Sequence, residues 1–251
     1  MKFVTFNIRL DWGRDGANNF AFRKPLILET LAAEKPDIIC FQEVLPHVLA
    51  WLKESLPEYT VLGCGRGPAL DDECVAIAFR TMDWNLVQLD TFWLSPTPRV
   101  PGSRYPDQSD CPRVAAEALL NRAGSGRVVR VVNTHLDHEG RQARALGLAQ
   151  ILRHIDGAEL FPDAPVIFAG DFNAAPDSPE LRAFERFPGY VNATEGIGRT
   201  YHGFMRGPGS SIDYIFLRGG VDCQGVTKWR HARDGVWLSD HYPVCATLEW
   251  R

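Results

Sequence analysis

The chain has 251 residues, of which 45% are hydrophobic and 23% are charged, as in ordinary globular proteins. Its formal net charge of −4 disfavours a protein whose main role is to coat nucleic acid through a basic face, but it leaves open an enzyme that acts on nucleic acid locally. The length suits one large domain or two small ones.

The first half of the chain reads mainly as strands. Residues 2–10 alternate as a strand, and residues 23–34 carry a helical period that Pro36 ends. A buried strand at 37–41 ends at Gln42 and Glu43, and a helix is expected at 46–55. The remaining strands expected in this half lie at 59–64, 74–80, 84–94, 114–121 and 127–134.

The second half begins with an amphipathic helix at 139–155, followed by a buried strand at 166–169 and a short helix at 178–184. Strands are expected at 212–217, 221–228 and 244–250. The stretches 95–113 and 187–211 are loops by composition, and loops of that length are often functional. Many strands with few helices, in two halves, favour two sheets packed face to face with helices outside. No break in composition divides residues 1–251, so we expect a single domain.

The cysteines and the start of the chain bear on compartment. The six cysteines lack C-x-x-C spacing, which argues against a zinc knuckle or a redox pair, and most of them are expected as small buried hydrophobes. The chain enters its first strand without the pattern of a signal peptide, and no apolar run has the length of a membrane span. We therefore expect a reduced, cytoplasmic protein without membrane insertion.

Polar residues recur where the predicted strands end. Taken singly, such a residue is usually a turn former or a helix cap. Glu43, His135 and His241 are not turn formers, however, so convergence of the strand ends at one rim explains the set better. The set comprises Asn7, Glu43, Asn133, His135, Asp137, Asp171, Asn173, Asp213, Asp240 and His241.

Carboxylate and amide oxygens in such a set suit a hard cation, Mg²⁺ or Mn²⁺. The histidines are not at zinc spacing, and they fit better as groups that stabilise phosphate charge or carry protons. Gly170 precedes Asp171 and is expected to let the backbone turn there. Together these features favour a metal-assisted hydrolase of phosphate esters.

Six motifs, in this order, resemble the endonuclease/exonuclease/phosphatase superfamily, which includes the pancreatic-type deoxyribonuclease. They are N-I-R (7–9), Q-E (42–43), N-T-H-L-D-H (133–138), G-D-F-N (170–173), I-D-Y-I-F (212–216) and S-D-H-Y-P (239–243). The resemblance spans residues 3 to 248. It implies a four-layer α/β/β/α sandwich, with two packed mixed β-sheets flanked by helices and the site at one end of the sheets.

The resemblance also implies roles. Glu43 is expected as the principal metal ligand with Asn7 close by, and Asp240 as a further ligand or as a carboxylate behind the ligands. The expected catalytic residues are Asp171 to orient or deprotonate the attacking water, Asn173 to hold a phosphate oxygen, His135 to contact the phosphate or assist the leaving group, and His241, oriented by Asp213, to bind a non-bridging oxygen or take the water proton.

Three flanking residues are candidates for substrate binding: Arg9, Arg113 and His202. Alternation along a strand would put Arg9 on the same face as Asn7, and a phosphate contact is favoured over the alternative of a surface arginine at a strand end. Arg113 opens a strand after a proline, and His202 lies in the second long loop. Asp137 is expected either as a partner of His135 or as the cap of the next helix.

The sequence thus predicts a Mg²⁺- or Mn²⁺-dependent hydrolase acting on a phosphoester substrate, as a monomer. A small phosphodiester or phosphorylated metabolite is favoured, because no basic surface interleaved with aromatic residues is evident. The alternatives are a nuclease of the DNA-repair type with the same machinery and, more remotely, a catalytically silent binding domain.

Overall fold

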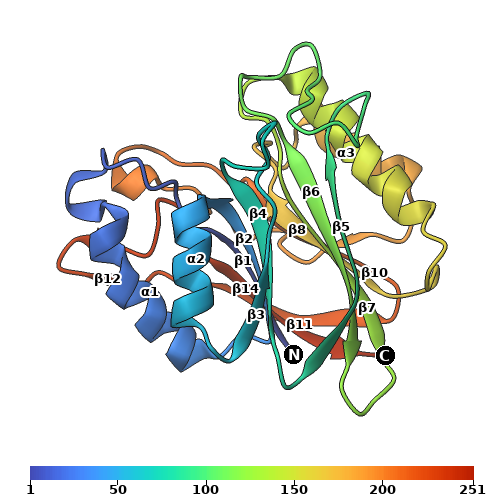
Figure 1. Ribbon diagram of the computed structural model, residues 1–251, viewed down its shortest axis with the longest axis horizontal. Helices are drawn as coiled ribbons and strands as arrows, with labels where there is room; N and C mark the ends of the chain where they lie inside the picture. The colour runs from blue at the N-terminus through green and yellow to red at the C-terminus, as the bar shows by residue number, and fades with distance from the viewer.

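Two mixed β-sheets pack face to face in the computed structural model, which describes residues 1–251, and helices cover their outer faces (Figure 1). The first sheet has the order β11-β14-β1-β2-β4-β3, and only β1 and β2 run parallel. Its strands are β1 (Lys2–Asn7), β2 (Ile38–Val44), β3 (Tyr59–Leu62), β4 (Cys74–Arg80), β11 (Val221–Lys228) and β14 (Val244–Trp250).

The second sheet has the order β5-β6-β7-β8-β10-β9, and only β7 and β8 run parallel. Its strands are β5 (Trp84–Trp93), β6 (Val114–Arg122), β7 (Val128–His135), β8 (Val166–Asp171), β9 (Val191–Asn192) and β10 (Asp213–Arg218). A separate short pair joins β12 (Ala232–Arg233) and β13 (Val236–Trp237).

Helices α1 (Phe20–Glu34) and α2 (Pro46–Ser55) cover the first sheet, while α3 (Arg141–Asp156) covers the second together with the 3-10 helix η2 (Pro179–Arg186) (Figure 1). Two further 3-10 turns are η1 (Gly16–Asn18) and η3 (Gly203–Met205). The four-layer α/β/β/α sandwich expected from the sequence is confirmed. No helix has the length and apolar character that crossing a bilayer requires.

Strand β1 shows how the sequence builds this architecture. Phe3 lies in the core between the two sheets, whereas Val4 and Phe6 pack with α1 and α2 in the outer core. Because both faces of the strand are buried, its apolar residues lie on both sides, and the alternation expected over residues 2–10 is wrong for this strand. Truncating Phe6 to alanine would cost about 3–5 kcal/mol of stability, as is typical of a buried aromatic side chain.

Several element boundaries differ from those expected, among them the start of α1 at Phe20 rather than 23 and the end of β2 at Val44 rather than 41. Strand β1 ends at Asn7 rather than at residue 10, and Arg9 has a left-handed backbone, with φ of 64°. The strand expected at 166–169 runs on to Asp171, and the segment around 178–184 forms a 3-10 helix. Helix α3 begins at Arg141 rather than at 139, because the Asp137 carboxylate holds the backbone N–H groups of Glu139 and Gly140 in a turn before the helix. The Asp107 carboxylate accepts from the first-turn N–H groups of Gln142 and Ala143.

The two parallel pairs place the polar strand ends together. β1 and β2 of the first sheet lie against β7 and β8 of the second, and all four strands carry polar residues at or next to their carboxyl ends. Parallel neighbours end at the same edge of a sheet, so this packing collects side chains from distant parts of the chain at one mouth.

Candidate active site

The register of the second sheet sets three polar residues side by side. His135 of β7 pairs with Asp171 of β8, and Asp171 pairs in turn with Asp213 of β10. In the first sheet, Asn7 of β1 pairs with Gln42 of β2, so Glu43 follows directly. The strand ends therefore form two facing rows of polar side chains.

A β-bulge directs Glu43 into the site. The register between β2 and β4 shifts between Phe41 and Val44, and Glu43 has a positive φ of 61°. A bulge inserts an unpaired residue and changes the direction of its side chain. The Glu43 carboxylate accepts hydrogen bonds from Asn7 Nδ2 at 2.9 Å and from the Leu10 backbone N–H at 2.6 Å. These bonds outweigh the effect of burial and lower the pKa of Glu43, which is thus held as a carboxylate.

Gly170 has a different role from the turn expected for it. It lies within β8 with φ of 147°, between Thr134 of β7 and Tyr214 of β10. A Cβ atom at this position would come within 2.0 Å of the Thr134 carbonyl oxygen. Glycine is needed because the backbones of two strands approach closely at the residue before Asp171. The turn comes after Asp171, where Asn173 has φ of 48° and donates its backbone N–H to Asp171 Oδ1 at 2.9 Å.

Asp171 lies between the two site histidines. Its Oδ2 atom is 3.5 Å from His135 Nε2 and 3.6 Å from His241 Nε2, and it accepts a hydrogen bond from Asn7 Nδ2 at 3.0 Å. Burial and the charge of Asp213 raise the pKa of Asp171 to about 7, although the His241 charge opposes this. Asp171 is therefore poised to exchange a proton near neutral pH.

His241 and Asp213 form a buried pair, with Nδ1 and Oδ2 at 2.8 Å. Burial alone would lower the pKa of His241, but the carboxylates of Asp213 and Asp171 outweigh it and raise that pKa to about 10. His135 has the opposite character. Burial and the nearby charges of Arg113 and Arg66 lower its pKa well below the ordinary value. The site thus holds one cationic and one neutral imidazole.

Asp240 and Arg9 form one side of the site. Asp240 is buried and its Oδ2 lies 3.5 Å from Arg9 Nη1, while the Arg9 guanidinium also donates to both carboxylate oxygens of Asp15 at 3.1 Å. Arg9 reaches the site through its left-handed backbone after β1, and not through the strand alternation that the sequence indicated. Its backbone N–H donates to Asn7 Oδ1 at 3.0 Å.

A cleft of about 730 Å³ lies at these strand ends. Of the expected site residues, Asn7, Asp213 and His202 do not line it. Asn7 and Asp213 lie directly beneath it, in contact with Glu43, Asp171 and His241. The lining residues are Arg9, Leu10, Trp12, Glu43, Arg66, Glu73, Cys111, Arg113, His135, His138, Asp171, Asn173, Ala175, Tyr201, Ser210, Ile212, Asp240 and His241.

His202 is not brought to the cleft. It is 1% exposed, and its ring stacks on Tyr242 at 4.2 Å and lies 5.0 Å from Trp237. Its neighbour Tyr201 lines the cleft instead, with its ring 4.9 Å from that of His241. Adjacent residues of an extended segment point in opposite directions. Tyr201 therefore faces the cleft while the next residue, His202, is buried.

Arg113 lines the cleft, and its Nη2 lies 2.9 Å from His138 Nδ1. Asp137 lies behind it, 3.5 Å from Arg113 Nε, and also binds the N-terminus of α3 and Ser109. Asp137 is therefore neither a hydrogen-bond partner of His135 nor the cap of α3: it binds the turn before the helix, and the Asp107 carboxylate accepts from the first-turn N–H groups of Gln142 and Ala143. The cleft is also lined by Arg66, Trp12, Cys111 and Ser210, which no periodicity or motif marked as site residues.

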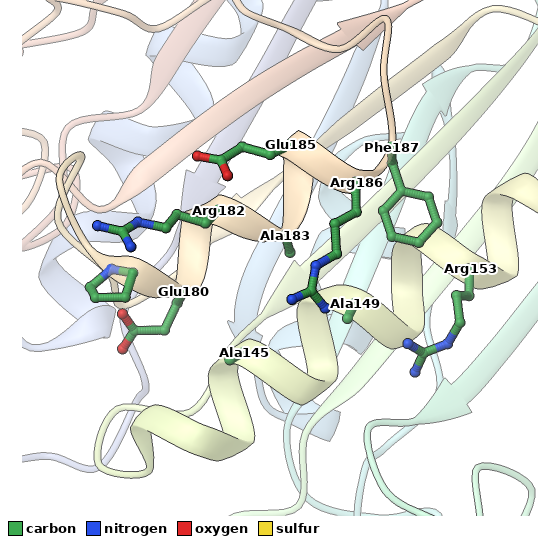
Figure 2. Close-up of a pocket in the computed structure, with 10 residues that line it drawn as sticks. Ala145, Ala149, Arg153, Glu180, Arg182, Ala183, Glu185, Arg186 and Phe187 are labelled. Carbon is green, nitrogen blue, oxygen red and sulfur yellow. The ribbon is translucent and has the colours of Figure 1, made fainter.

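A second cavity, of about 450 Å³, lies between α3 and η2 (Figure 2). Arg186 reaches from η2 toward Ala149 of α3, and Arg153 projects from α3 at one end of the cavity. No histidine or cysteine lines it, and its arginines are exposed. The chemistry is therefore concentrated in the cleft at the strand ends.

Two sets of side chains in this cleft can be considered for a cation. Asp171, Asp213 and His241 offer ligand atoms within 4.8 Å of one another, but the closest of these atoms already join His241 to Asp213. Glu43 keeps its charge and lines the cleft near Asp171 and Asp240, which together make a set of carboxylate oxygens. Oxygen ligands of this kind fit Mg²⁺ or Mn²⁺. Asn7 presents its NH₂ group to these carboxylates, so its amide would have to rotate to act as a ligand.

Comparison with known proteins identifies the family to which this fold and cleft correspond. The model of the Endonuclease/Exonuclease/phosphatase family matches residues 4–241. An endonuclease/exonuclease/phosphatase from Bacteroides vulgatus is 30% identical over 100% of this chain and 98% of its own, with a TM-score of 0.93. A mannosyl-6-phosphatase from Bacteroides thetaiotaomicron is 27% identical over 100% of both chains, with a TM-score of 0.90.

A functionally unknown protein from Enterococcus faecalis is 26% identical over 100% of both chains, with a TM-score of 0.90. No curated protein matches the chain. Because the family model covers almost the whole sequence, and the six motifs that suggested it meet in one cleft, the chain belongs to the endonuclease/exonuclease/phosphatase family.

Proposed function

We propose that this protein is a divalent-metal-dependent hydrolase of phosphate esters. The observation that carries the proposal is the position of Asp171, whose Oδ2 lies 3.5 Å from His135 and 3.6 Å from His241 on the floor of a cleft that Glu43 also lines. A carboxylate that titrates near neutrality, flanked by a neutral and a cationic imidazole, suits the activation of water beside a phosphate.

Glu43 would be the principal ligand of the metal, with Asp240 close by and Asn7 fixing the Glu43 carboxylate. When bound, Mg²⁺ or Mn²⁺ would polarise the phosphoryl group and neutralise its charge. The fit rests on the carboxylate chemistry of the donor set and on the bulge that turns Glu43 into the cleft. Arg9 pairs with Asp15 and Asp240, so it would offset part of the negative charge of the carboxylates on this side of the cleft.

The remaining residues act on the substrate and the water. Asp171 would orient the attacking water and accept its proton, and the His241 cation, held by Asp213, would donate to a non-bridging phosphate oxygen. Neutral His135 would contact the phosphate or assist the leaving group. Asn173, whose Nδ2 donates to the Leu136 carbonyl at 3.0 Å, stands at the cleft to hold a phosphate oxygen.

Arg9 and Arg113 are proposed as substrate-binding residues at the two sides of these catalytic groups. The size of the cleft supports a small phosphorylated molecule as the substrate, since cavities of several hundred Å³ match ligands of that size. Similarity to a mannosyl-6-phosphatase across both whole chains supports the same class. The net charge of −4 does not favour long nucleic acid.

The test is a screen of phosphate monoesters, small diesters, plasmid DNA and abasic DNA in Mg²⁺ and in Mn²⁺, with the His241→Ala variant as the blank. We expect metal-dependent release of phosphate or alcohol from small esters. Cleavage of DNA alone, weakening steeply with salt, would identify a nuclease instead, and no metal-dependent turnover on any ester would contradict the proposal.

A further inference from the structure

Two arginines, Arg66 and Arg113, line one part of the cleft and are both almost completely buried, at 6% and 4% exposed. Arg66 comes from the loop before β4 and Arg113 from the residue before β6. Both also border a small neighbouring cavity together with Glu43, Glu73 and His135. Burying two guanidinium groups beside the same cavity is costly unless each is paired, so their partners decide what they can bind.

Arg66 is held rigidly. Its backbone N–H donates to the Glu73 carbonyl at 2.9 Å, and its own carbonyl accepts from Trp93 Nε1 at 2.6 Å. The guanidinium Nη2 is paired with Glu73, and Nε lies 3.4 Å from Asp72. A Cβ on the preceding Gly65 would come within 2.2 Å of the Asp71 carbonyl oxygen, so the loop is folded tightly on itself. Nη1 makes no hydrogen bond to the protein.

Arg113 is fixed in a similar way from another element. Its Nε lies 3.5 Å from Asp137 and its Nη2 lies 2.9 Å from His138 Nδ1, while its Nη1 is buried without a partner. Two carboxylates, those of Glu73 and Asp72, therefore offset the charge of Arg66, and that of Asp137 offsets the charge of Arg113. Each guanidinium keeps one nitrogen with no acceptor in the protein, and that of Arg113 is buried. A buried, unpaired N–H group costs free energy that an anionic ligand would recover, and guanidinium groups bind carboxylates and phosphates especially well.

The free Nη1 groups of Arg66 and Arg113 are not needed to bind the scissile phosphate. His241, Asn173 and Arg9 come from other segments and are proposed to serve the scissile phosphate. We propose that Arg66, together with Arg113, forms a second anion subsite, so that the substrate is a small phosphate ester that carries an additional carboxylate or phosphate group. This inference rests on the proposed function and narrows its substrate class.

The experiment measures equilibrium binding by calorimetry in excess Mg²⁺, which requires no turnover. The ligands are propylphosphonate, with one anionic group, phosphonopropionate, which has a carboxylate in place of the terminal methyl, and ethylenediphosphonate, which has a second phosphonate. We expect at least one of the two-anion ligands to bind about tenfold more tightly than propylphosphonate, as an added charge-assisted hydrogen bond gives. Which of them gains more identifies the second group as carboxylate or phosphate.

The Arg66→Met variant should lose this tenfold preference and bind propylphosphonate as the wild type does. Arg66→Lys, which keeps the charge without the planar fork, should keep part of the preference and guards against misfolding of the loop. Arg186→Met, at an exposed arginine on η2, controls for loss of one positive charge.

Equal binding of all three ligands by the wild type, or an equal loss for all three in Arg66→Met, would overturn the second subsite. Tighter binding of the two-anion ligands without metal-dependent hydrolysis of any ester would leave the subsite standing and contradict the proposed function, so the two failures are distinguishable.

Discussion

Replacing Asp213 with asparagine should separate the charge of the His241–Asp213 pair from its shape. The Asp213 and His241 side chains are 2% and 5% exposed, and their Oδ2 and Nδ1 atoms lie 2.8 Å apart. Asparagine keeps the volume of the aspartate while removing its negative charge. Asp213 is the strongest influence that raises the pKa of His241, so that pKa should fall by about 1–3 pH units, as is usual when an opposite charge this close is lost.

The magnitude follows from the pKa itself. A rise in the pKa of His241 from 6.5 to about 10 corresponds to about 5 kcal/mol at about 1.4 kcal/mol per pH unit. This is the net result of burial, which lowers the pKa, and of Asp213, Asp171 and Asp240, which raise it. Removing one partner of a buried ion pair typically costs about 3–5 kcal/mol, so we expect Asp213→Asn to lose about 3 kcal/mol of unfolding free energy. Loss of the cation beside the phosphate should lower kcat about 10²–10³-fold.

The sign with pH is fixed by the direction of the shift. Because the pKa of His241 is higher in the folded than in the unfolded protein, the pair contributes fully below pH 6.5, and its contribution is lost as the pH rises through about 10. Denaturant unfolding of the metal-free protein from pH 6 to pH 10 should therefore show a larger loss of stability in wild type than in Asp213→Asn.

The assay is a nitrogen-15 NMR titration of His241 in the metal-free protein, with kcat measured in Mg²⁺. Asp222→Asn is the control, because Asp222 pairs with Arg251 at the exposed surface, where ion pairs contribute little to stability. A His241 ring that still titrates above pH 9 in Asp213→Asn, or an unchanged kcat, would refute the reasoning.

Three other variants test separate parts of the account. Asp171→Ala should reduce hydrolysis more than about 10²-fold, as loss of a general base does, with an unchanged far-ultraviolet circular dichroism spectrum, and full activity would contradict its role. Gly170→Ala should lower the unfolding free energy by at least about 3 kcal/mol, because its Cβ would meet the Thr134 carbonyl oxygen at 2.0 Å. The control Gly124→Ala, with φ of 71° and no atom within 4 Å of the added Cβ, should lower it by about 1 kcal/mol. Equal losses in denaturant unfolding would exclude the close approach as the cause. The pKa of Asp137 is lowered from 3.8 to about 2, because hydrogen bonds from Ser109 and Gly140 outweigh the effect of burial. Asp137 should therefore contribute about 2 kcal/mol of stability that is lost as the pH falls from about 4 to about 2. Asp137→Asn should show no such loss in acid unfolding.

The fold and much of the site were predictable because their signals are local. Apolar runs that end in Asn7, Glu43, His135 and Asp171 indicate buried strands with polar ends, and these strands pair as the two-sheet architecture requires. The presence of strand β1 was predicted, but its burial on both faces was not, because that depends on the second sheet packing against it.

What the sequence could not give depends on packing between distant segments. The bulge at Glu43 exists only relative to the β4 register, and the need for Gly170 arises from the backbone of β7. Arg66 enters the cleft because Trp93 and Glu73 fix its loop, a contact that no spacing encodes. Tyr201 rather than His202 faces the cleft, because the His202 ring packs against Trp237 and Tyr242. The segment is irregular, so its sequence does not indicate which residue faces which way.

Diffraction from crystals grown with Mn²⁺, using the anomalous signal of the ion, addresses the metal proposal without recourse to any substrate. We predict a single strong peak in the cleft at bonding distance from the Glu43 carboxylate, absent in crystals of Glu43→Gln. A peak at another place on the molecule, or occupancy of the cleft that is unchanged in Glu43→Gln, would mean that the strand ends do not converge in order to hold a metal beside Asp171.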